Sequence, residues 1–371
     1  MAYHSFMKVL ITGAHFTPAV AVIEELKKRP SAQIVYVGRK KSQEGDSTLS
    51  VESQEIPKLG VKFIPIITGR LQRSFTIFTI PSFLKIPVGF IQAFFIILME
   101  KPDVILSFGG YVAVPVVIAG WFFSVPIIVH EQTLVSGLAN RISGWFADKI
   151  ALSFDRGLKH GKTILTGNPL RREILNPLKN LSIKNTIPTI LVTGGNQGSH
   201  VINLAVEEIL DNLTKIASII HVTGDNRFHD FERLEKLQNE KYLVKKWIGE
   251  EWATVLSKTD LVVSRAGINT LTELAYLKKP ALVIPIPYLF QDEQNKNAKY
   301  FEKLGFVRIL AQSKLSGKSL LENIKKMLKD LDYLKDQAKM AEQVVKLDAA
   351  KRLALETLLL AKKKNTSDDN I

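Results

Sequence analysis

Short apolar runs alternate with helical patterns along most of the chain. In the first half, these runs predict strands at residues 8–12, 33–37, 61–66, 104–108, 127–130 and 149–152. A glycine turn at 13–15 separates the first strand from a helical pattern that ends near residue 28, and Pro18 fits the first turn of that helix. Such alternation is typical of an α/β protein with a doubly wound sheet.

The second half of the chain repeats this pattern. Strands are predicted at 189–193, 219–223, 261–264 and 281–285. Helices are predicted from a second glycine turn to about residue 213, and at 270–277, 318–331 and 333–361. The repetition predicts two Rossmann-like domains, with the boundary in the proline- and asparagine-rich stretch 167–188.

Two stretches are apolar enough to be considered as membrane segments. Residues 112–129 contain two prolines and continue into a polar segment, so we interpret them as a buried helix followed by a strand covered on both faces. Residues 75–99 contain two prolines and Lys85, which a spanning helix would tolerate poorly. Two interpretations stay open for this stretch: an amphipathic element that dips into a bilayer, or a loop followed by a core helix at 88–99.

The charge and the lack of cysteine limit the classes of function that are expected for this chain. The chain has 371 residues, with 50 Lys and Arg against 36 Asp and Glu, and a formal net charge of +14. This excess suits nucleic acid, an anionic membrane or an anionic substrate, but no nucleic-acid-binding motif accompanies it, so we expect no nucleic-acid partner. The lack of cysteine excludes disulfides and Cys-ligated metals. The opening residues do not predict a cleaved signal peptide.

Glycine turns after two predicted strands are candidate anion sites. Gly194, Gly195 and Gly198 stand between a strand and a helix. Glycines allow close approach there, and a helix N-terminus offers N–H groups to a phosphate. The stretch 107–111 gives a second possible nest. The alternative for both is a plain turn that links a strand to a helix.

Polar residues also follow later strands, at the edge where open α/β sheets bind ligands. Glu273 is placed to accept hydrogen bonds from ribose hydroxyls, but Thr270 and Glu273 also have the spacing of a helix capping box. Segment 291–297 carries groups suited to sugar hydroxyls, and its alternative is a solvated helix start with Asp292 near the cap. Both pairs of interpretations stay open.

Two histidines follow strands in the first half. His15 lies in the first glycine turn and suits a general base near neutral pH, and the alternative is a loop histidine bonded to backbone. His130 precedes Glu131 and Gln132, and this group is either a structural hydrogen-bond cluster or a substrate contact. No Asp-x-Asp pair follows a predicted strand, and no metalloprotease, EF-hand, ATPase or nucleophile-elbow motif is present, so no metal or other cofactor is expected.

The order of several motifs is more specific than any one of them. SFGGY, HEQ, LANR, GNPLR, LVTGGNQGS, SRAGINTLTE and DEQNKNA follow one another between residues 8 and 310. In this order they resemble the MurG family, the membrane-associated N-acetylglucosaminyltransferases of peptidoglycan synthesis. The resemblance implies the GT-B fold, two facing Rossmann-like domains with a cleft between them. It also implies an inverting, metal-independent transfer of GlcNAc from UDP-GlcNAc to the 4-hydroxyl of a polyprenyl-linked muramoyl-peptide (lipid I), which yields lipid II.

The resemblance assigns roles to residues of this chain. For UDP-GlcNAc it implies Arg171, Gly195, Asn196, Gln197, Arg265, Gly267, Thr270, Glu273, Gln294 and Asn297. For the acceptor it implies Thr12, Gly13, Ala14, Tyr111, Gln132 and Asn140. An inverting transfer needs a base for the acceptor hydroxyl, for which we nominate His15, with Glu131 as its competitor.

The resemblance also suggests a division of the chain. Residues 1–168 would form an acceptor- and membrane-binding domain, 169–335 a UDP-GlcNAc-binding domain, 336–361 a helix that packs back on the first domain, and 362–371 a disordered tail. A polyprenyl acceptor stays in the bilayer. The family therefore implies a peripheral enzyme on the cytoplasmic face of the plasma membrane, beside anionic lipid and other cell-wall synthesis proteins.

Three segments depart from the family pattern. Residues 10–15 read LITGAH where the family typically has GGTGGH. Asn196 stands where serine is usual, and Thr133 where asparagine follows HEQ. Two alternatives therefore stay open: a related transferase for another lipid acceptor such as diacylglycerol, and a non-catalytic sugar-nucleotide-binding protein.

Overall fold

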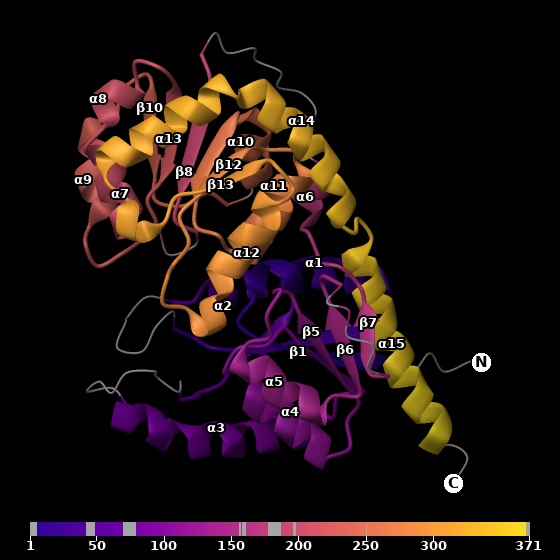
Figure 1. The fold of residues 1–371 in the computed structure, drawn as a ribbon. Coiled ribbons are helices and arrows are strands. Elements are labelled where there is room, and N and C mark those ends of the chain that lie inside the picture. The colour runs from indigo at the N-terminus through magenta and orange to yellow at the C-terminus, as the bar shows by residue number, and fades with distance from the viewer. Residues whose placement is uncertain are drawn as a thin grey trace. The chain divides into compact units, whose positions relative to one another are not determined.

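The structure is a computed structural model that describes residues 6–41, 49–69, 79–155, 157, 161–176, 187–195, 198–249 and 251–368. The side chains of residues 79–84, 290 and 364–368 lie outside this description. The chain divides into two compact units, Met1–Arg171 with Lys346–Ile371, and Arg172–Val345 (Figure 1). Each unit is an α/β domain by itself.

The first unit is built on a seven-stranded parallel sheet of order β3-β2-β1-β4-β5-β6-β7. Its strands are β1 Met7–Thr12, β2 Ala32–Gly38, β3 Lys62–Pro65, β4 Val104–Ser107, β5 Ile127–Glu131, β6 Lys149–Leu152 and β7 Thr163–Leu165. The strand order reverses between β1 and β4. In an open α/β sheet this reversal leaves a crevice at the carboxyl ends of the strands.

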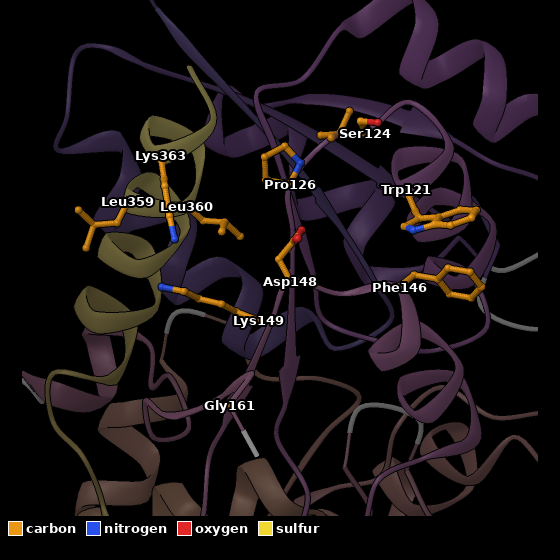
Figure 2. A pocket seen from close by; sticks show the side chains of 11 residues that line it. Trp121, Ser124, Pro126, Phe146, Asp148, Lys149, Gly161, Leu359, Leu360 and Lys363 are labelled. Carbon is orange, nitrogen blue, oxygen red and sulfur yellow. The ribbon is translucent and has the colours of Figure 1, made fainter. Parts of the chain in front are cut away.

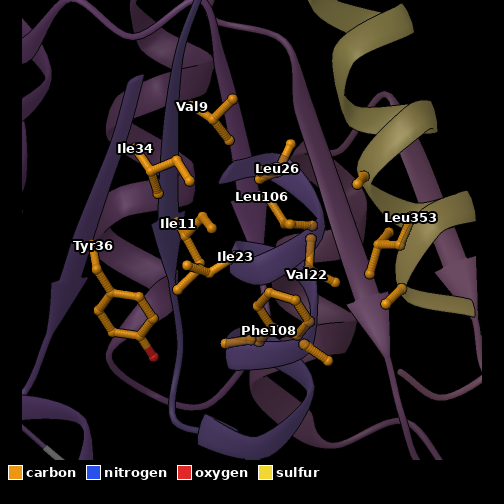
Figure 3. Packing of buried hydrophobic residues seen from close by; sticks show 14 of the residues in the cluster. Val9, Ile11, Val22, Ile23, Leu26, Ile34, Tyr36, Leu106, Phe108 and Leu353 are labelled. Atoms are coloured by element: carbon orange, nitrogen blue, oxygen red, sulfur yellow. The ribbon is translucent and has the colours of Figure 1, made fainter. Parts of the chain in front are cut away.

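Helices cover both faces of this sheet. They are α1 Phe16–Lys27, α2 Val51–Glu55, η1 Pro57–Leu59, α3 Thr79–Glu100, α4 Ala113–Phe122, α5 Leu138–Phe146 and α15 Ala349–Asp368. Val9 and Ile11 of β1 pack in one core with α1 and with Leu353 of α15 (Figure 3). Leu10 points to the other face and joins a core with α3 and α4. Burial on both faces explains why the strand segments are continuously apolar.

The second unit has a six-stranded parallel sheet of order β10-β9-β8-β11-β12-β13. Its strands are β8 Thr189–Thr193, β9 Ser218–Val222, β10 Tyr242–Lys245, β11 Leu261–Ser264, β12 Ala281–Val283 and β13 Val307–Ile309. Here the order reverses between β8 and β11, which places a second crevice at their carboxyl ends. Both units therefore have the topology that the alternating sequence pattern predicts.

Helices also surround the second sheet. The longer ones are α7 His200–Glu207, α10 Trp252–Lys258, α11 Ile268–Tyr276, α12 Glu293–Glu302, α13 Gly317–Lys329 and α14 Leu331–Ala341. The shorter ones are α6 Arg172–Leu175, α8 Leu210–Leu213, α9 Asp230–Leu234, η2 Glu235–Leu237, η3 Phe290–Asp292, η4 Gln312–Lys314 and η5 Glu342–Val344. The core holds the apolar faces of α7 and α13 against β8 and β11.

Every predicted strand is present, and the structure adds β7, β10 and β13. All three are edge strands of three or four residues. An edge strand is buried less completely than a central one, so its apolar pattern is weaker and harder to detect in the sequence.

Two helical segments differ from expectation. Helix α3 begins at Thr79 and includes Pro87, so the expected loop just before residue 88 is helical, while residues 70–78 lie outside the described part. The helix expected over 333–361 is divided between α14 and α15, and α15 continues to Asp368. The tail expected to be disordered from residue 362 therefore begins as a continuation of α15, whose earlier turns are rich in alanine and leucine and whose next three residues are lysines, all strong helix formers. No described helix is both long and apolar enough to cross a bilayer.

Candidate active-site residues

In the first unit, the loops after β1 and β4 are joined by backbone hydrogen bonds. Phe108 N donates to Thr12 O at 2.7 Å, and Ala14 N donates to Gly109 O at 3.0 Å. Gly13 has φ of 143°, and a Cβ there would lie 2.8 Å from the Phe108 carbonyl carbon, so only glycine fits. The predicted acceptor residues of these two loops are thus brought together at the switch point.

Glu131 ends β5 and is buried beside the same loops. Its Oε1 accepts from Thr133 Oγ1 at 2.8 Å and from Thr133 N at 3.1 Å, and its Oε2 accepts from Asn140 Nδ2 at 3.0 Å. A carboxylate bound through both oxygens is well suited to fixing the loop after β5 and the start of α5. It is less well suited to taking a proton from a substrate.

His15 occupies the N-cap position of α1, and most of its side chain is buried. Burial, with a smaller contribution from the positive charge of Arg39, lowers the pKa of His15 to about 4. The imidazole is therefore neutral at neutral pH, and a ring nitrogen is available to accept a proton. Its hydrogen bonds thus give Glu131 a structural role, and His15 stays the nominated base.

Sequence reasoning missed Arg39, which follows the carboxyl end of β2. Its Nε donates to the buried Glu52 carboxylate at 2.9 Å, and, against the lowering effect of burial, Glu52 and Tyr111 both raise the pKa of its guanidinium. Arg39 therefore places a positive charge beside His15 and Tyr111. The available signal was its position directly after a buried parallel strand.

Several buried polar atoms at this edge have no hydrogen-bond partner among the described residues. They include Thr12 Oγ1, Gln132 Oε1 and Asn140 Oδ1. Native proteins seldom leave such atoms unsatisfied, so ordered water or a polar ligand is expected there. His130 has both kinds of atom: its Nε2 lies 3.2 Å from both Gly167 O and Ser153 Oγ, whereas its Nδ1 is buried without a partner among the described residues, so both interpretations of this residue stay open.

In the second unit, the glycine turn after β8 is packed against β9. A Cβ on Gly198 would lie 1.8 Å from Thr223 O, and one on Gly194 would lie 2.2 Å from the Gly198 carbonyl carbon. Helix α7 then begins at His200 without a side-chain cap. The turn therefore has the close backbone approach and open N–H groups of an anion nest. Asn196 and Gln197 lie outside the described residues.

The capping-box interpretation of Glu273 is wrong. Helix α11 begins at Ile268, after Gly267 in extended conformation, so Thr270 lies inside the helix and caps nothing. The Glu273 side chain is buried, and its Oε2 accepts from the Trp252 indole N–H at 2.8 Å. Trp252 was not predicted, because it reaches Glu273 from α10 and no local sequence pattern links the two helices.

Other predicted residues of this unit have fixed contacts. Arg265 donates from one guanidinium nitrogen to Ile284 O at 2.9 Å and to Gln312 Oε1 at 2.7 Å, and burial lowers its pKa. Gln294 accepts from Ile286 N at 3.0 Å. Asn297 is fully buried; its Nδ2 lies 3.4 Å from Ala266 O, and its Oδ1 has no partner among the described residues.

Two further residues that the sequence singled out have defined positions in the structure. Asp292 occupies the N-cap position of α12, but its side chain makes no bond to the helix backbone and instead accepts from Asn295 Nδ2 at 2.5 Å. Arg171 is the last residue of the first unit. In the described part of the chain, no group of three His, Asp or Glu side chains could hold a metal ion.

Two Rossmann-like domains, each with a glycine turn at its switch point, are the architecture of the GT-B fold class. Among solved structures, MurG of Acinetobacter baumannii matches 95% of this chain and 99% of its own at a TM-score of 0.69 and 22% identity. The calicheamicin glycosyltransferase CalG4 matches 95% of this chain and 98% of its own at a TM-score of 0.67 and 12% identity. A UDP-GlcNAc 2-epimerase from Neisseria meningitidis shares the fold at a TM-score of 0.62 and 14% identity, with 95% and 100% coverage.

Sequence comparisons narrow this class to a family. The N-terminal domain model of glycosyltransferase family 28 matches residues 12–152, and the C-terminal domain model matches residues 189–353. A relative from Clostridium botulinum is 36% identical over 331 residues, 85% of this chain and 90% of the relative. One from Bacillus cytotoxicus is 31% identical over 363 residues, 94% and 97% of the two chains. Both are named UDP-N-acetylglucosamine--N-acetylmuramyl-(pentapeptide) pyrophosphoryl-undecaprenol N-acetylglucosamine transferase.

The chain therefore belongs to glycosyltransferase family 28 and, within it, to the MurG family. This confirms the predicted fold class and the resemblance on which the residue assignments depend. The individual site residues are not tested by the comparisons and stay predictions.

Proposed function

We propose that this protein transfers N-acetylglucosamine from UDP-GlcNAc to the 4-hydroxyl of a polyprenyl-linked N-acetylmuramoyl-peptide. The observation that carries the proposal is the similarity to transferases of that name over most of both chains. The arrangement of each unit supports it, since the candidate residues lie at the carboxyl ends of parallel strands beside the two switch points.

The second unit supplies what a nucleotide sugar requires. The turn after β8 and the start of α7 would receive the diphosphate, because open N–H groups at a helix start favour negative charge. Glu273 would accept from the ribose hydroxyls, with Trp252 orienting its carboxylate. Asn297 Oδ1 would accept a further hydrogen bond from the substrate. Negative charge that develops on departing UDP would then meet these fixed dipoles.

The first unit supplies the acceptor side. His15 would remove the proton from the attacking hydroxyl while the glycosidic bond to UDP breaks, which inverts the anomeric centre in one displacement. A variant His15→Ala should lower the transfer rate by about 10² to 10⁴-fold, the usual contribution of a general base. UDP binding should be unchanged. If the loss is only a few-fold, another group is the base.

We also propose that the first unit contacts the membrane, where a polyprenyl acceptor resides. Phe90, Ile91, Phe94, Phe95, Ile118, Ala119 and Phe122 of α3 and α4 line a shallow apolar hollow of about 390 Å³, here called the apolar surface. Ile91 is 58% exposed and Phe122 64% exposed. An exposed cluster of this kind, in a chain of net charge +14, suits a peripheral enzyme on an anionic cytoplasmic leaflet.

A transfer assay tests the catalytic proposal. Purified protein is incubated with labelled UDP-GlcNAc and a short-chain lipid I analogue, and the disaccharide product is measured against diacylglycerol as a competing acceptor. Transfer to the muramoyl substrate supports the proposal. Transfer only to diacylglycerol, epimerisation of UDP-GlcNAc, or binding without turnover would each contradict it.

A further inference from the structure

The loops at the switch point of the first unit offer few backbone N–H groups to an anion. Ala14 N donates to Gly109 O at 3.0 Å, and Gly109 N donates to Ser107 Oγ at 3.2 Å, so both donors are engaged within the protein. Pro18 stands in the first turn of α1 and has no N–H group. A phosphate bound at this edge of the sheet therefore needs donors from side chains.

Two of the buried atoms without partners at this edge do not suit a phosphate. Gln132 Oε1 and Asn140 Oδ1 have no hydrogen-bond partner among the described residues. Both are hydrogen-bond acceptors, so they suit the hydroxyl and amide N–H groups of a sugar and would repel a phosphate oxygen. An acceptor substrate that carries both a sugar and a phosphate therefore needs a cation from elsewhere.

Arg39 is placed to supply this cation. It follows β2, which pairs with β1 so that Val37 lies opposite Thr12, and this register puts Arg39 beside the loop that contains His15. Burial is the main cause of the low pKa of His15, and the charge of Arg39 is the second. Arg39 also interacts electrostatically with Tyr111, which lies in the loop after β4. The guanidinium is thus close to candidate acceptor residues from two loops.

The Arg39 side chain is held in place by α2. Ser50 caps this helix, and its hydroxyl donates to Arg39 O at 2.6 Å. Glu52, in the first turn of α2, is 3% exposed and accepts from Arg39 Nε at 2.9 Å. A buried ion pair adds little net stability, because the cost of desolvation offsets much of the attraction. The pair is therefore better explained as a contact that orients the guanidinium.

Arg39 keeps hydrogen-bonding capacity after it has paired with Glu52. A guanidinium has five N–H groups, and Glu52 accepts from the one on Nε. The Arg39 side chain is 23% exposed, so part of it stays open to a ligand. The planar guanidinium can bind two phosphate oxygens at once, which an ammonium group cannot do with the same geometry. We infer that Arg39 binds the diphosphate that links the acceptor sugar to its polyprenyl chain, and that Glu52 positions Arg39 for this contact. This inference rests on the proposed function, which supplies the acceptor.

Calorimetry with two acceptors tests the inference. The full-length protein, with UDP present so that no sugar is transferred, is titrated with a short-chain lipid I analogue and with an alkyl glycoside of the same muramoyl-peptide, which has no phosphate. Arg39→Gln should raise the Kd for the diphosphate analogue at least about tenfold, and the Kd for the glycoside less than about twofold. Equal losses for the two acceptors would show a merely structural role. An unchanged Kd for the diphosphate analogue would show that Arg39 does not bind it, and either result overturns the inference.

Arg29→Gln is the matched control for the single variant. Arg29 is exposed and precedes β2, so it lies at the amino ends of the strands, whereas Arg39 follows β2 at their carboxyl ends. The substitution removes the same charge from the same unit and should leave both Kd values within about twofold of wild type. If it weakens the diphosphate analogue as much as Arg39→Gln does, the effect comes from net charge and the assigned contact is refuted.

A double variant keeps the test valid if the single variant folds poorly, since Arg39→Gln leaves the buried Glu52 without its cation. Arg39→Gln with Glu52→Gln removes both charges and should show the same selective loss for the diphosphate analogue. The matched control is Lys149→Gln with Glu356→Gln. This pair, 2.6 Å apart, lies beside a cavity of about 750 Å³ at the amino end of β6 (Figure 2). Its removal should leave both acceptors bound as in wild type, and equal losses in the two double variants would count against the assignment.

UDP and the transfer assay separate the remaining possibilities. The Kd for UDP should be the same in wild type and Arg39→Gln, and a selective loss of UDP binding would assign Arg39 to the donor and overturn the inference. If wild type binds the diphosphate analogue through Arg39 but transfers no sugar, the proposed function fails and the phosphate contact stands. If wild type transfers sugar and Arg39→Gln does so with an unchanged KM for the analogue, the phosphate contact fails alone.

Discussion

Replacing Trp252 with phenylalanine removes the indole N–H that the Glu273 carboxylate accepts at 2.8 Å, while keeping most of the aromatic volume. Glu273 is 4% exposed, so water cannot easily replace the lost donor. A hydrogen bond to a charged group contributes about 1.5–3 kcal/mol. If Glu273 holds the ribose through an orientation that Trp252 sets, part of this free energy appears as weaker binding of UDP.

The expected magnitude follows from the same figures. Each 1.4 kcal/mol changes a dissociation constant by about tenfold, so Trp252→Phe should raise the Kd for UDP by up to about 100-fold. Titration calorimetry measures this directly. The same titration with 2′,3′-dideoxy-UDP shows whether the ribose hydroxyls are involved. Wild-type protein should prefer UDP strongly, and Trp252→Phe should lose most of that preference.

A matched control is available on α11 itself. Tyr276→Phe also removes one side-chain donor, since the Tyr276 hydroxyl donates to Leu175 O at 2.9 Å, but it does so one turn beyond Glu273, at the last residue of the helix. This variant should leave the Kd for UDP unchanged. If Trp252→Phe binds UDP as tightly as Tyr276→Phe does, or keeps the full preference for UDP over its dideoxy analogue, the positioning role of Trp252 is refuted.

Three further predictions concern stability and the membrane. Burial lowers the pKa of His130 to about 4 and that of His221 to about 3, so below pH 6.5 the unfolded chain binds more protons than the folded protein. The free energy of unfolding should therefore fall by about 1.4 kcal/mol per pH unit per histidine below that pH. A melting temperature that does not change between about pH 7 and 5 would contradict this. Gly198→Ala should lower the melting temperature far more than Gly195→Ala, because only the first Cβ meets backbone, at 1.8 Å, while both residues have positive φ; similar losses would count against the tight turn. Ile91→Glu should reduce the recovery of the protein with anionic vesicles in a flotation assay. Leu237→Glu, which changes an exposed leucine of the second unit, should not reduce it. Equal recovery of the two variants would show that the apolar surface does not contribute to membrane contact.

Much of the fold could be predicted because both sheets are parallel and covered on both faces. The central strands are then continuous apolar runs, and the residues that follow them in the chain are the ones at the ligand-binding edge. This is why Gly13, Gly198 and Glu273 could be selected from the sequence. Edge strands such as β7 could not, since partial burial weakens their pattern.

The contacts that tune the site could not be predicted, because they join segments that are distant in the chain. Arg39 reaches Tyr111 from the end of another strand, and Trp252 reaches Glu273 from another helix. Neither pair has a characteristic spacing. The choice between a capping box and a ligand-binding carboxylate at Glu273 depended on a helix boundary, and boundaries are the least certain part of any sequence pattern.

The structure also shows where the residues that depart from the family pattern in the first loop lie. Leu10 and Ile11, which replace the first two glycines of the family pattern, lie inside β1, where each packs in one of the two cores of the sheet. These replacements strengthen the strand and leave the turn untouched. At the turn itself the sole change is Ala14, whose methyl group faces Gly110, where an added Cβ would approach it to 2.7 Å.

Only one of the facing positions 14 and 110 can therefore carry a side chain, and in this protein it is position 14. Gly13 keeps its positive φ, the Tyr36 hydroxyl donates to Gly13 O at 2.9 Å, and Ala14 N keeps its bond to Gly109 O. The backbone turn that precedes His15 is thus held from two sides despite the altered sequence. The altered first loop was the reason to keep a non-catalytic interpretation open. Its changes improve strand packing and add one methyl group that the structure accommodates, so they give no structural reason to expect weaker acceptor binding.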